Sequence, residues 1–323
     1  MADKVRLDIS IGDYPHTHRI LTGEIEIAGV EPNFIRVVPQ IGAYRRMVRD
    51  HEFDVCEIAP TTYMIARGYG APFVGLPIFL MRQFNHSSLL VRPDAGITEP
   101  RQLEGRRVGV RAYSVTTGVW LRSILIEDYG VDLSKITWVV DDEEHVRELV
   151  LPPNVVHTSP GESLHDLMAT GNLVAGFKGN AGVGRKGSPT GDGWQVVPTD
   201  YPQLFPNAAE IEAESYRRTG IYPIHGVLVV KDAVLAEHPW IAKSLYEAFA
   251  TAKAEWLVDH HAGRSTDKLD DKYRKLRRIV GDDPLPYGLE ANAASIAALA
   301  RTAWDQKLSP RPLTIEEIIV GSD

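Results

Sequence analysis

The sequence is poor in cysteine, because Cys56 is the only one among 323 residues. A single thiol excludes a disulfide framework and a zinc site built from clustered cysteines. The residues around it, "FDV" before and "EIAP" after, form an apolar run that is typical of a buried strand. We therefore expect Cys56 to be a buried and unreactive core residue.

Long apolar runs and an excess of positive charge are also missing. No stretch approaches the roughly 20 apolar residues of a membrane-spanning helix. The 35 Lys and Arg against 43 Asp and Glu give a formal net charge of −8. This balance argues against nucleic acid or an anionic membrane as a partner, but it allows a locally basic pocket. The start of the chain, "MADKVRLDISIGDY", shows no secretory leader, so we expect a cytoplasmic protein.

Short apolar runs alternate with helical patterns through the first half of the chain. The predicted strands are "VRLDISI", "PNFIRVVP", "FDVCEIA", "FVGLPIFL", "SSLLVR" and "RRVGVRAY", and the helical patterns include "GAYRRMVRD", "TTYMIARGYG" and "TTGVWLRSILIEDYG". This alternation predicts βαβ units, a mostly parallel sheet and the α/β fold class. Residues 232–305 are mostly helical, with one break around "GDDPLP".

Two segments resemble crossings between domains, "LMRQFNHSSLLVRPDAGITEP" and "YRRTGIYPIHGVLVVKDAV". They predict a discontinuous first domain, 1–90 plus 225–323, around a second domain, 91–224, with a cleft between the two. We expect the cleft to close on a ligand, with 82–92 and 217–228 as its hinge. The glycine-rich stretch 179–194 lacks the Ser or Thr that follows the lysine of a phosphate-binding loop, and it is predicted to be a surface loop.

Polar residues follow several predicted strands, where open α/β folds bind ligands. Helix starts offer backbone N–H groups and hydroxyls to an anion, and a guanidinium can hold a carboxylate with two hydrogen bonds. The alternatives are ordinary helix capping for the hydroxyls and solvation for the arginines. The predicted substrate-binding residues are Arg19, Thr61, Thr62, Arg82, His86, Arg111, Tyr113, Ser114, Thr116 and Thr117.

Histidine is the side chain that changes its charge near neutral pH. His16 and His18 in "DYPHTHRI", His86, and His225 in "YPIHG" fall at strand ends or crossings, and we expect them to line one cleft. Glu57 follows a strand, where a carboxylate needs a partner or a shifted pKa. The candidate catalytic residues are therefore His16, His18, His225 and Glu57. Seven other histidines are expected on helix surfaces or in loops: His51, His145, His157, His165, His238, His260 and His261.

A divalent metal is an open alternative. His16, His18 and Glu57, with His86 or His225, would offer nitrogen and oxygen ligands to zinc, iron or manganese. No helical spacing of the HExxH type fixes two such ligands on one face. The sequence therefore favours a site without metal.

The combination of "DYPHTHRI", "MRQFNHSSLLV" and "YPIHG" resembles the 4,5-dihydroxyphthalate decarboxylase family, and the match runs over nearly the whole chain. The resemblance implies the type 2 periplasmic-binding-protein fold and a cytoplasmic carboxy-lyase. The implied reaction converts 4,5-dihydroxyphthalate to 3,4-dihydroxybenzoate and CO2. "LEGRRVGV" is widespread among solute receptors and carries little information on function.

In 4,5-dihydroxyphthalate each carboxylate is para to a hydroxyl, so the substrate can supply its own electron sink. Neither pyridoxal phosphate nor thiamine is then required. The protein must supply a general acid, an acceptor for the phenol proton and a clamp for the spectator carboxylate. The expected partner is a small aromatic carboxylate, and a homo-oligomer is possible. The alternative function is a solute-binding protein for a small aromatic or pyrimidine-like anion, without catalysis.

Overall fold

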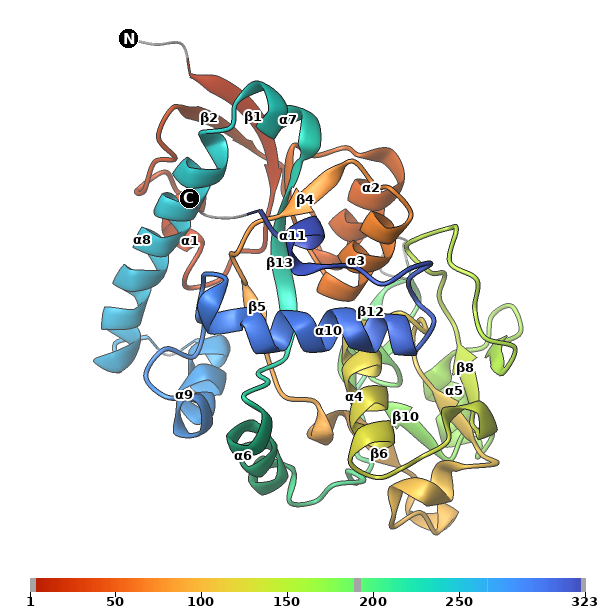
Figure 1. Ribbon diagram of the computed structural model, residues 1–323. Helices are drawn as coiled ribbons and strands as arrows, with labels where there is room; N and C mark the ends of the chain where they lie inside the picture. Colours follow the sequence, from red (N-terminus) through yellow and green to blue (C-terminus); the bar gives the residue numbers. More distant parts are fainter. Residues whose placement is uncertain (1–3, 189–192, 266, 321–323) are drawn as a thin grey trace.

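Two sheets organise the chain in the computed structural model, which describes residues 4–188, 193–265 and 267–320 (Figure 1). The first sheet has the order β2 (Val30–Phe34), β1 (Val5–Ser10), β3 (Val55–Ile58), β13 (Ile224–Lys231) and β4 (Phe73–Gly75), with β5 (Met81–Arg82) also pairing with β13. The second has the order β6 (Leu89–Val91), β10 (Ala175–Phe177), β7 (Arg107–Gly109), β8 (Thr137–Val140) and β9 (Val155–His157). We call the parts built on these sheets the first and second lobes.

Most strands run parallel, as expected. β1 is parallel to β2 and β3, and in the second sheet β10, β7, β8 and β9 are parallel to one another. β13 is antiparallel to β3, β4 and β5, and β6 is antiparallel to β10. This arrangement confirms the predicted two-lobed α/β fold. A short pair, β11 (Arg185–Lys186) and β12 (Gln195–Val196), lies apart from the two sheets.

Helices cover the sheets. They are α1 (His18–Leu21), α2 (Ile41–Asp50), α3 (Pro60–Gly68), α4 (Thr116–Glu127), α5 (Leu164–Ala169), α6 (Ala208–Thr219), α7 (Asp232–Glu237), α8 (Ile241–His261), α9 (Lys268–Val280), α10 (Ala293–Asp305) and α11 (Ile315–Ile318). The three helical patterns predicted in the first half of the chain correspond to α2, α3 and α4, which begin within one residue of the predicted starts. Single 3-10 turns are η1 (His86–Ser88), η2 (Pro93–Ala95), η3 (Pro100–Leu103), η4 (Leu133–Lys135), η5 (Gly179–Ala181) and η6 (Glu290–Asn292).

β3 shows why the first sheet is apolar on both faces. Val55 packs into one core cluster and Cys56 into another, because successive side chains of a strand point to opposite faces. Cys56 is fully buried, as predicted. The strand predicted at 73–80 ends at Gly75 instead, because Pro77 cannot donate a hydrogen bond to a ladder.

The two predicted crossings lie side by side, since Arg82 pairs with Ile224 and the amide of Gln83 donates to the carbonyl of Pro223 at 3.4 Å. The predicted boundaries after residues 90 and 224 fall within β6 and β13. The division at those residues stays a prediction. The described part of the glycine-rich stretch forms η5 and β11, while residues 189–192 lie outside the described residues.

A third connection between the lobes was not predicted. α10 lies across both of them (Figure 1). On the second lobe, Arg122 of α4 donates to Gln306 at 2.8 Å, and the hydroxyls of Ser123 and Thr302 are 3.0 Å apart. Beyond α10, the chain returns to the first lobe, where the amide of Val320 bonds to β4. None of the helices in the described ranges is long and apolar enough to cross a membrane.

Candidate functional site

A cavity of about 150 Å³ lies between the two lobes, and we call it the interlobe pocket. Cavities of about this volume hold a benzene molecule, so the pocket suits a single aromatic ring. Six of its lining residues were predicted as site residues: Thr62, Arg111, Ser114, Thr116, Thr117 and His225. Tyr44, His145 and Asn180 also line it and were not predicted as site residues.

Two helices begin at the pocket, one from each lobe. α3 follows β3, and α4 follows β7, so each presents its first-turn N–H groups at a strand end. Neither N-cap residue, Ala59 or Val115, caps its helix with a side chain, so these helix starts lack the usual capping. Thr61 donates to the carbonyl of Ser114 at 2.8 Å and lies 2.6 Å from the hydroxyl of Thr116. The predicted ligand contact Thr61 therefore joins the two helix starts and does not line the pocket.

A carboxylate of the protein itself already occupies part of this anion-binding region. Glu144 accepts from the amide of Tyr113 at 2.6 Å and from both the amide and the hydroxyl of Ser114. The amides just before α4 thus bind a carboxylate in this conformation. This contact illustrates the kind of group that the helix start recognises.

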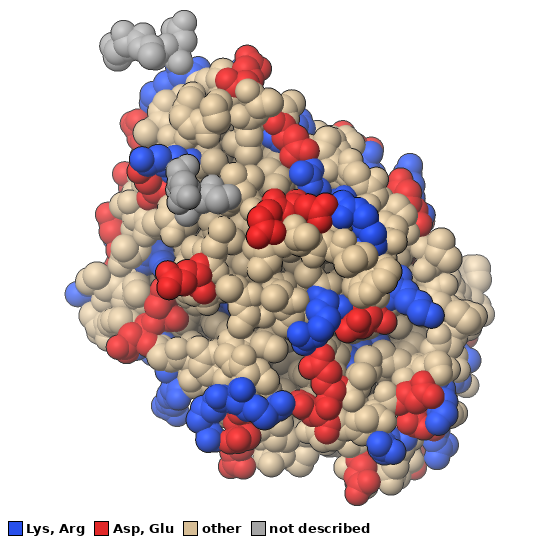
Figure 2. Space-filling model, in the orientation of Figure 1, with Lys and Arg blue, Asp and Glu red and all other residues tan. Residues whose placement is uncertain are grey.

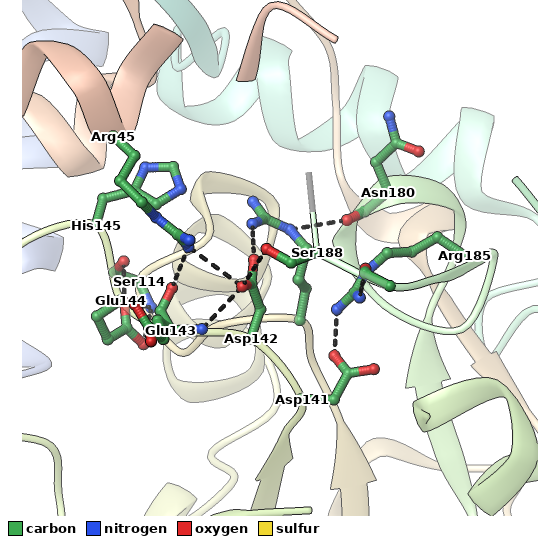
Figure 3. Close-up of polar contacts among 12 residues, drawn as sticks. Arg45, Ser114, Asp141, Asp142, Glu143, Glu144, His145, Asn180, Arg185 and Ser188 are labelled. Carbon is green, nitrogen blue, oxygen red and sulfur yellow. Dashed lines mark hydrogen bonds and ion pairs between the residues drawn. The ribbon is translucent and has the colours of Figure 1, made fainter. Parts of the chain in front are cut away.

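Arg111 is the principal buried cation of the pocket, with 3% of its surface exposed. It lies 2.8 Å from Asp142 and donates to the Asn180 carbonyl at 3.0 Å. Arg45 of α2 and Ser188 also converge on Asp142, at 3.2 and 3.0 Å (Figure 3). Burial opposes ionisation of Asp142, but the two arginines outweigh it and hold the pKa of this carboxyl below its usual value. The pair Arg45 and Asp142 links the lobes across the pocket.

Two histidines contribute buried ring nitrogens that lack a hydrogen-bond partner among the described residues, the Nε2 atoms of His145 and His225. Burial, reinforced by Arg111 and Arg45, lowers the pKa of His145 to about 3. Burial, Lys272 and Arg82 lower the pKa of His225 well below 6.5. Both imidazoles are therefore neutral at pH 7 before an anion binds. A nearby carboxylate would raise both pKa values.

Glu57 does not line the interlobe pocket, but it is hydrogen-bonded to Tyr44, which does. Its carboxyl is 1% exposed and accepts from the Gly12 amide at 2.9 Å and from the Tyr14 hydroxyl at 2.9 Å. Tyr44, which lines the pocket, also hydrogen-bonds to it. Burial raises the pKa of Glu57 to about 7, although these hydrogen bonds act in the opposite direction. The pair of Glu57 and Tyr44 can therefore hold or release a proton near neutral pH.

His16 does not join His225, which corrects the expectation that the predicted histidines converge. The His16 ring is fully buried, with Nε2 3.0 Å from the Leu80 carbonyl, and it packs against Tyr14 and Trp256. Burial lowers its pKa to about 3. The turn after β1 directs the ring into the core beneath α8, since Thr17 donates back to the Gly12 carbonyl.

His18 and Arg19 also lie away from the pocket. Nδ1 of His18 is 2.9 Å from Asp13 at the exposed surface. Arg19 pairs with Glu255 and Asp259, because α1 packs against α8.

Three more predicted ligand contacts are buried elsewhere. Arg82 is fully buried, donates to the Tyr222 carbonyl and lies over the ring of that tyrosine. His86 packs edge-on against Phe205, in the second lobe. Tyr113 lies beneath Arg122, whose guanidinium carbon is 3.8 Å from the centroid of the tyrosine ring.

The candidate metal ligands His16, His18, Glu57 and His86 are therefore distributed over separate places. Among residues 4–188, 193–265 and 267–320, no three His, Cys, Asp or Glu side chains are grouped to hold a metal ion. The residues present do not fit a metal site in this conformation.

His145 and His260 correct a second expectation, since both are buried instead of lying on the surface. The only sequence signal near His145 is the acidic run "DDEEH", which resembles a solvated loop. Its burial results from Arg45 and Arg49 of α2, which bond to residues 142–145. Contacts over such sequence separations leave no local pattern.

Comparisons with known proteins agree with this fold. A family model described as "ABC transporter, phosphonate, periplasmic substrate-binding protein" matches residues 25–154. The alkanesulfonate-binding protein SsuA of Xanthomonas axonopodis pv. citri, bound to MOPS, superimposes with a TM-score of 0.54 at 12% identity, covering 99% of both chains. The desulfurization enzyme DSZB, as a mutant in complex with biphenyl-2-sulfinic acid, gives a TM-score of 0.53 at 14% identity, covering 98% of this chain and 97% of its own. At these identities the likeness shows the fold alone, and the fold supports both binding and catalysis.

Two relatives are much more similar in sequence. The 4,5-dihydroxyphthalate decarboxylase of Comamonas testosteroni is 31% identical over 98% of this chain and 96% of its own length. The 4,5-dihydroxyphthalate decarboxylase of Pseudomonas putida is 33% identical over 54% of this chain and 70% of its own length. The similarity to the first relative extends through both lobes and both crossings, and the chain belongs to the 4,5-dihydroxyphthalate decarboxylase family.

Proposed function

We propose that this protein is a carboxy-lyase that removes CO2 from a dihydroxylated aromatic dicarboxylate, with 4,5-dihydroxyphthalate as substrate and 3,4-dihydroxybenzoate as product. The observation that carries the proposal is the content of the interlobe pocket. A space for one ring contains a buried guanidinium, two neutral imidazoles and a tyrosine backed by a titratable carboxyl. Family membership supports the same reaction.

Arg111 and the uncapped N-terminus of α4 are proposed to hold the carboxylates. The guanidinium can bind a carboxylate oxygen through charge-assisted hydrogen bonds. Thr116 and Thr117, in the first turn of α4, line the same pocket. Together these groups orient the substrate ring and select substrates that carry a negative charge.

The neutral imidazoles of His145 and His225 can act as bases toward the phenol group of the substrate. An unpartnered Nε2 can accept the phenol proton, and the positive charge that results is stabilised by the bound dianion. Partial deprotonation sends electron density into the ring, toward the para carbon that carries the carboxylate.

We assign to Glu57 and Tyr44 the delivery of the proton that the ring carbon receives. When the C–C bond breaks and CO2 leaves, its electron pair remains on the ring carbon, and a new C–H bond forms there. The proton comes from Tyr44, which takes the proton of neutral Glu57. The imidazolium returns its proton to the phenolate oxygen of the product, and solvent reprotonates Glu57. Among the predicted catalytic residues His16, His18, His225 and Glu57, the raised pKa of Glu57 and the lowered pKa of His225 favour Glu57 as the source of this proton.

The substrate carries its own electron sink in this scheme, so we propose that no pyridoxal phosphate or thiamine is needed. A cytoplasmic location and a homo-oligomer stay predictions. Binding without chemistry is the second candidate function. The family model for residues 25–154 and the likeness to SsuA favour it, because a receptor needs only the anion-binding half of the pocket.

The decisive experiment incubates the full chain with 4,5-dihydroxyphthalate and measures CO2 and 3,4-dihydroxybenzoate, with and without a chelator. The proposal expects both products in equal amounts, and the same rate with chelator. Tyr44→Phe should lower turnover by about 10²-fold or more, since positioned proton transfer contributes 10²- to 10⁴-fold. Tyr69→Phe, at an exposed tyrosine, is the matched control. Tight binding without any product would support the receptor instead.

A further inference from the structure

A second cavity, of about 750 Å³, lies between α6, α9 and the loop after β10, and we call it the α9 cavity. Four lysines line it: Lys178, Lys268, Lys272 and Lys275. In Figure 2, Lys and Arg side chains gather over the adjoining α6 and α9 at the lower left of the molecule. This basic region is unusual in a chain with a formal net charge of −8.

None of these four lysines forms an ion pair with another described residue. In the described parts of the chain, no carboxylate oxygen lies within 4.0 Å of the Nζ atom of any of the four. Lys272 is partly buried, and its Nζ contacts only neutral groups, Gln83 Oε1 at 3.3 Å and Met81 Sδ at 3.9 Å. Lys178 donates to the Ser87 hydroxyl at 2.9 Å. Burial, and then the charge of Lys178, lower the pKa of Lys272 to about 8.

The two acidic residues that line the cavity are engaged with other groups. Asp271 pairs with Arg274 at 2.6 Å. Glu212 accepts from the His86 amide at 3.1 Å and attracts Lys178 electrostatically, but burial raises its pKa to about 7, so it neutralises the lysines only in part at neutral pH. The space therefore presents unneutralised positive charge to whatever enters it.

The remaining wall is apolar. Phe84, Pro206, Leu276 and Ile279 contribute aromatic or aliphatic surface beside the lysines. Such a lining suits a ligand that combines an anionic group with an apolar body, because hydrophobic walls hold the body and a few charged groups orient it. An inorganic anion would use only the lysines.

The α9 cavity adjoins the interlobe pocket. The ring of His225, which lines that pocket, hydrogen-bonds to the backbone of Gln83, which lines the cavity. Lys178 of the cavity and Asn180 of the pocket are two residues apart in one loop. A molecule in the α9 cavity is thus separated from the interlobe pocket by few side chains.

We propose that the α9 cavity is a second binding site, specific for aromatic carboxylates, beside the interlobe pocket. The occupant is inferred from the proposed function, whose substrate and product are both aromatic carboxylates. The unpaired lysines provide attraction over a distance, and the apolar wall provides selection for the ring.

Calorimetric titration with phthalate tests this inference without turnover, because phthalate has both carboxylates and lacks the hydroxyls of the electron sink. Wild-type protein should bind two molecules. The double variant Lys178→Gln with Lys272→Met should bind one, with at least a tenfold loss of affinity at the other site. Arg111→Ala should instead weaken the site that the double variant retains. Lys243→Gln, at an exposed lysine of α8, is the control for lost charge and should bind two.

Titration with 3,4-dihydroxybenzoate shows whether the α9 cavity binds the reaction product. Titration with inorganic phosphate tests whether the cavity prefers aromatic carboxylates to a small anion. Single-site binding by wild-type protein, or two-site binding by the double variant, would overturn the inference. Equal affinity for phosphate would also overturn it. The single variant Lys178→Gln, at an exposed residue, guards against a folding defect in the double variant. Two-site binding without any decarboxylation would refute the proposed function and leave the second site intact.

Discussion

The substitution Glu57→Gln tests how much the ionisation of the buried Glu57 carboxyl affects the stability of the folded protein. Glutamine retains the size of the side chain and an acceptor oxygen for the Gly12 amide, but it cannot ionise. In the native protein the pKa of Glu57 is raised from 4.5 to about 7, chiefly by burial. This difference corresponds to about 3 kcal/mol of stability, since one pH unit is worth about 1.4 kcal/mol. The residue is 1% exposed, so solvent screening is small.

The sign of the pH dependence follows from which form is favoured. The folded protein favours neutral Glu57, whereas the unfolded chain ionises near pH 4.5. The stabilisation is complete below pH 4.5 and disappears as the pH rises to about 7. Relative to Glu57→Gln, wild-type protein should therefore lose about 3 kcal/mol of unfolding free energy between pH 4.5 and 7.5. His145 and His225 have lowered pKa values and contribute stability that is lost as the pH falls below 6.5, and this effect cancels between the two proteins.

Urea denaturation across this pH range measures the difference. Glu52→Gln is the control, because Glu52 is largely solvated and its pKa is lowered by a hydrogen bond from Arg46. Its removal should not reproduce the loss of stability toward neutral pH. Parallel stability curves for wild-type protein and Glu57→Gln would refute the raised pKa. If the curves diverge as expected and turnover is unchanged, Glu57 is a buried acid without a role in proton transfer.

The remaining predictions concern ligand binding, catalysis and cleft motion. Arg111→Ala should weaken phthalate binding by about 1.5 to 3 kcal/mol in calorimetry, and wild-type affinity in this variant would remove Arg111 from the clamp. Arg111→Lys should recover little of the lost affinity, because lysine lacks the planar fork. His225→Asn should lose turnover by about 10²-fold or more, while His18→Asn, at the surface, should retain it; equal rates for the two would make His225 structural. Arg49 donates to the carbonyls of Glu144 and His145 across the lobes, so Arg49→Ala should increase the radius of gyration in solution scattering, and saturating ligand should reduce it again. An unchanged radius in both measurements would contradict cleft opening.

The sequence predicted most reliably those features that depend on neighbouring residues. The strand and helix order, the burial of Cys56 and the position of Thr62, Ser114 and Thr116 after strand ends all follow from local pattern. Position along the chain, however, does not determine where a side chain points. His16 follows β1 as predicted, yet its ring turns into the core because α8 and α9 cover that side of the loop.

Contacts between distant segments account for the features of the pocket that sequence reasoning missed. Arg45 and Asp142 are 97 residues apart, and neither carries a motif that predicts the pair. Tyr44 lies within the amphipathic helix α2, and its proposed part in proton transfer depends on its hydrogen bond to Glu57 of β3. The packing of α10 across both lobes likewise depends on Gln306 meeting Arg122, which no periodicity indicates.

The surroundings of Glu57 favour the proposed catalytic function over simple binding. A receptor cleft needs donors for its anion, and Arg111 with the start of α4 supplies them. It does not need a buried carboxyl, whose raised pKa lowers the stability of the folded protein by about 3 kcal/mol at neutral pH. The fold nevertheless makes room for that carboxyl, because a Cβ at Gly226 would lie only 2.8 Å from its Oε1 atom. Strongly perturbed carboxyls concentrate at sites that transfer protons. The burial of Glu57 beside Tyr44 therefore supports the proposed transfer of a proton to the bound ring.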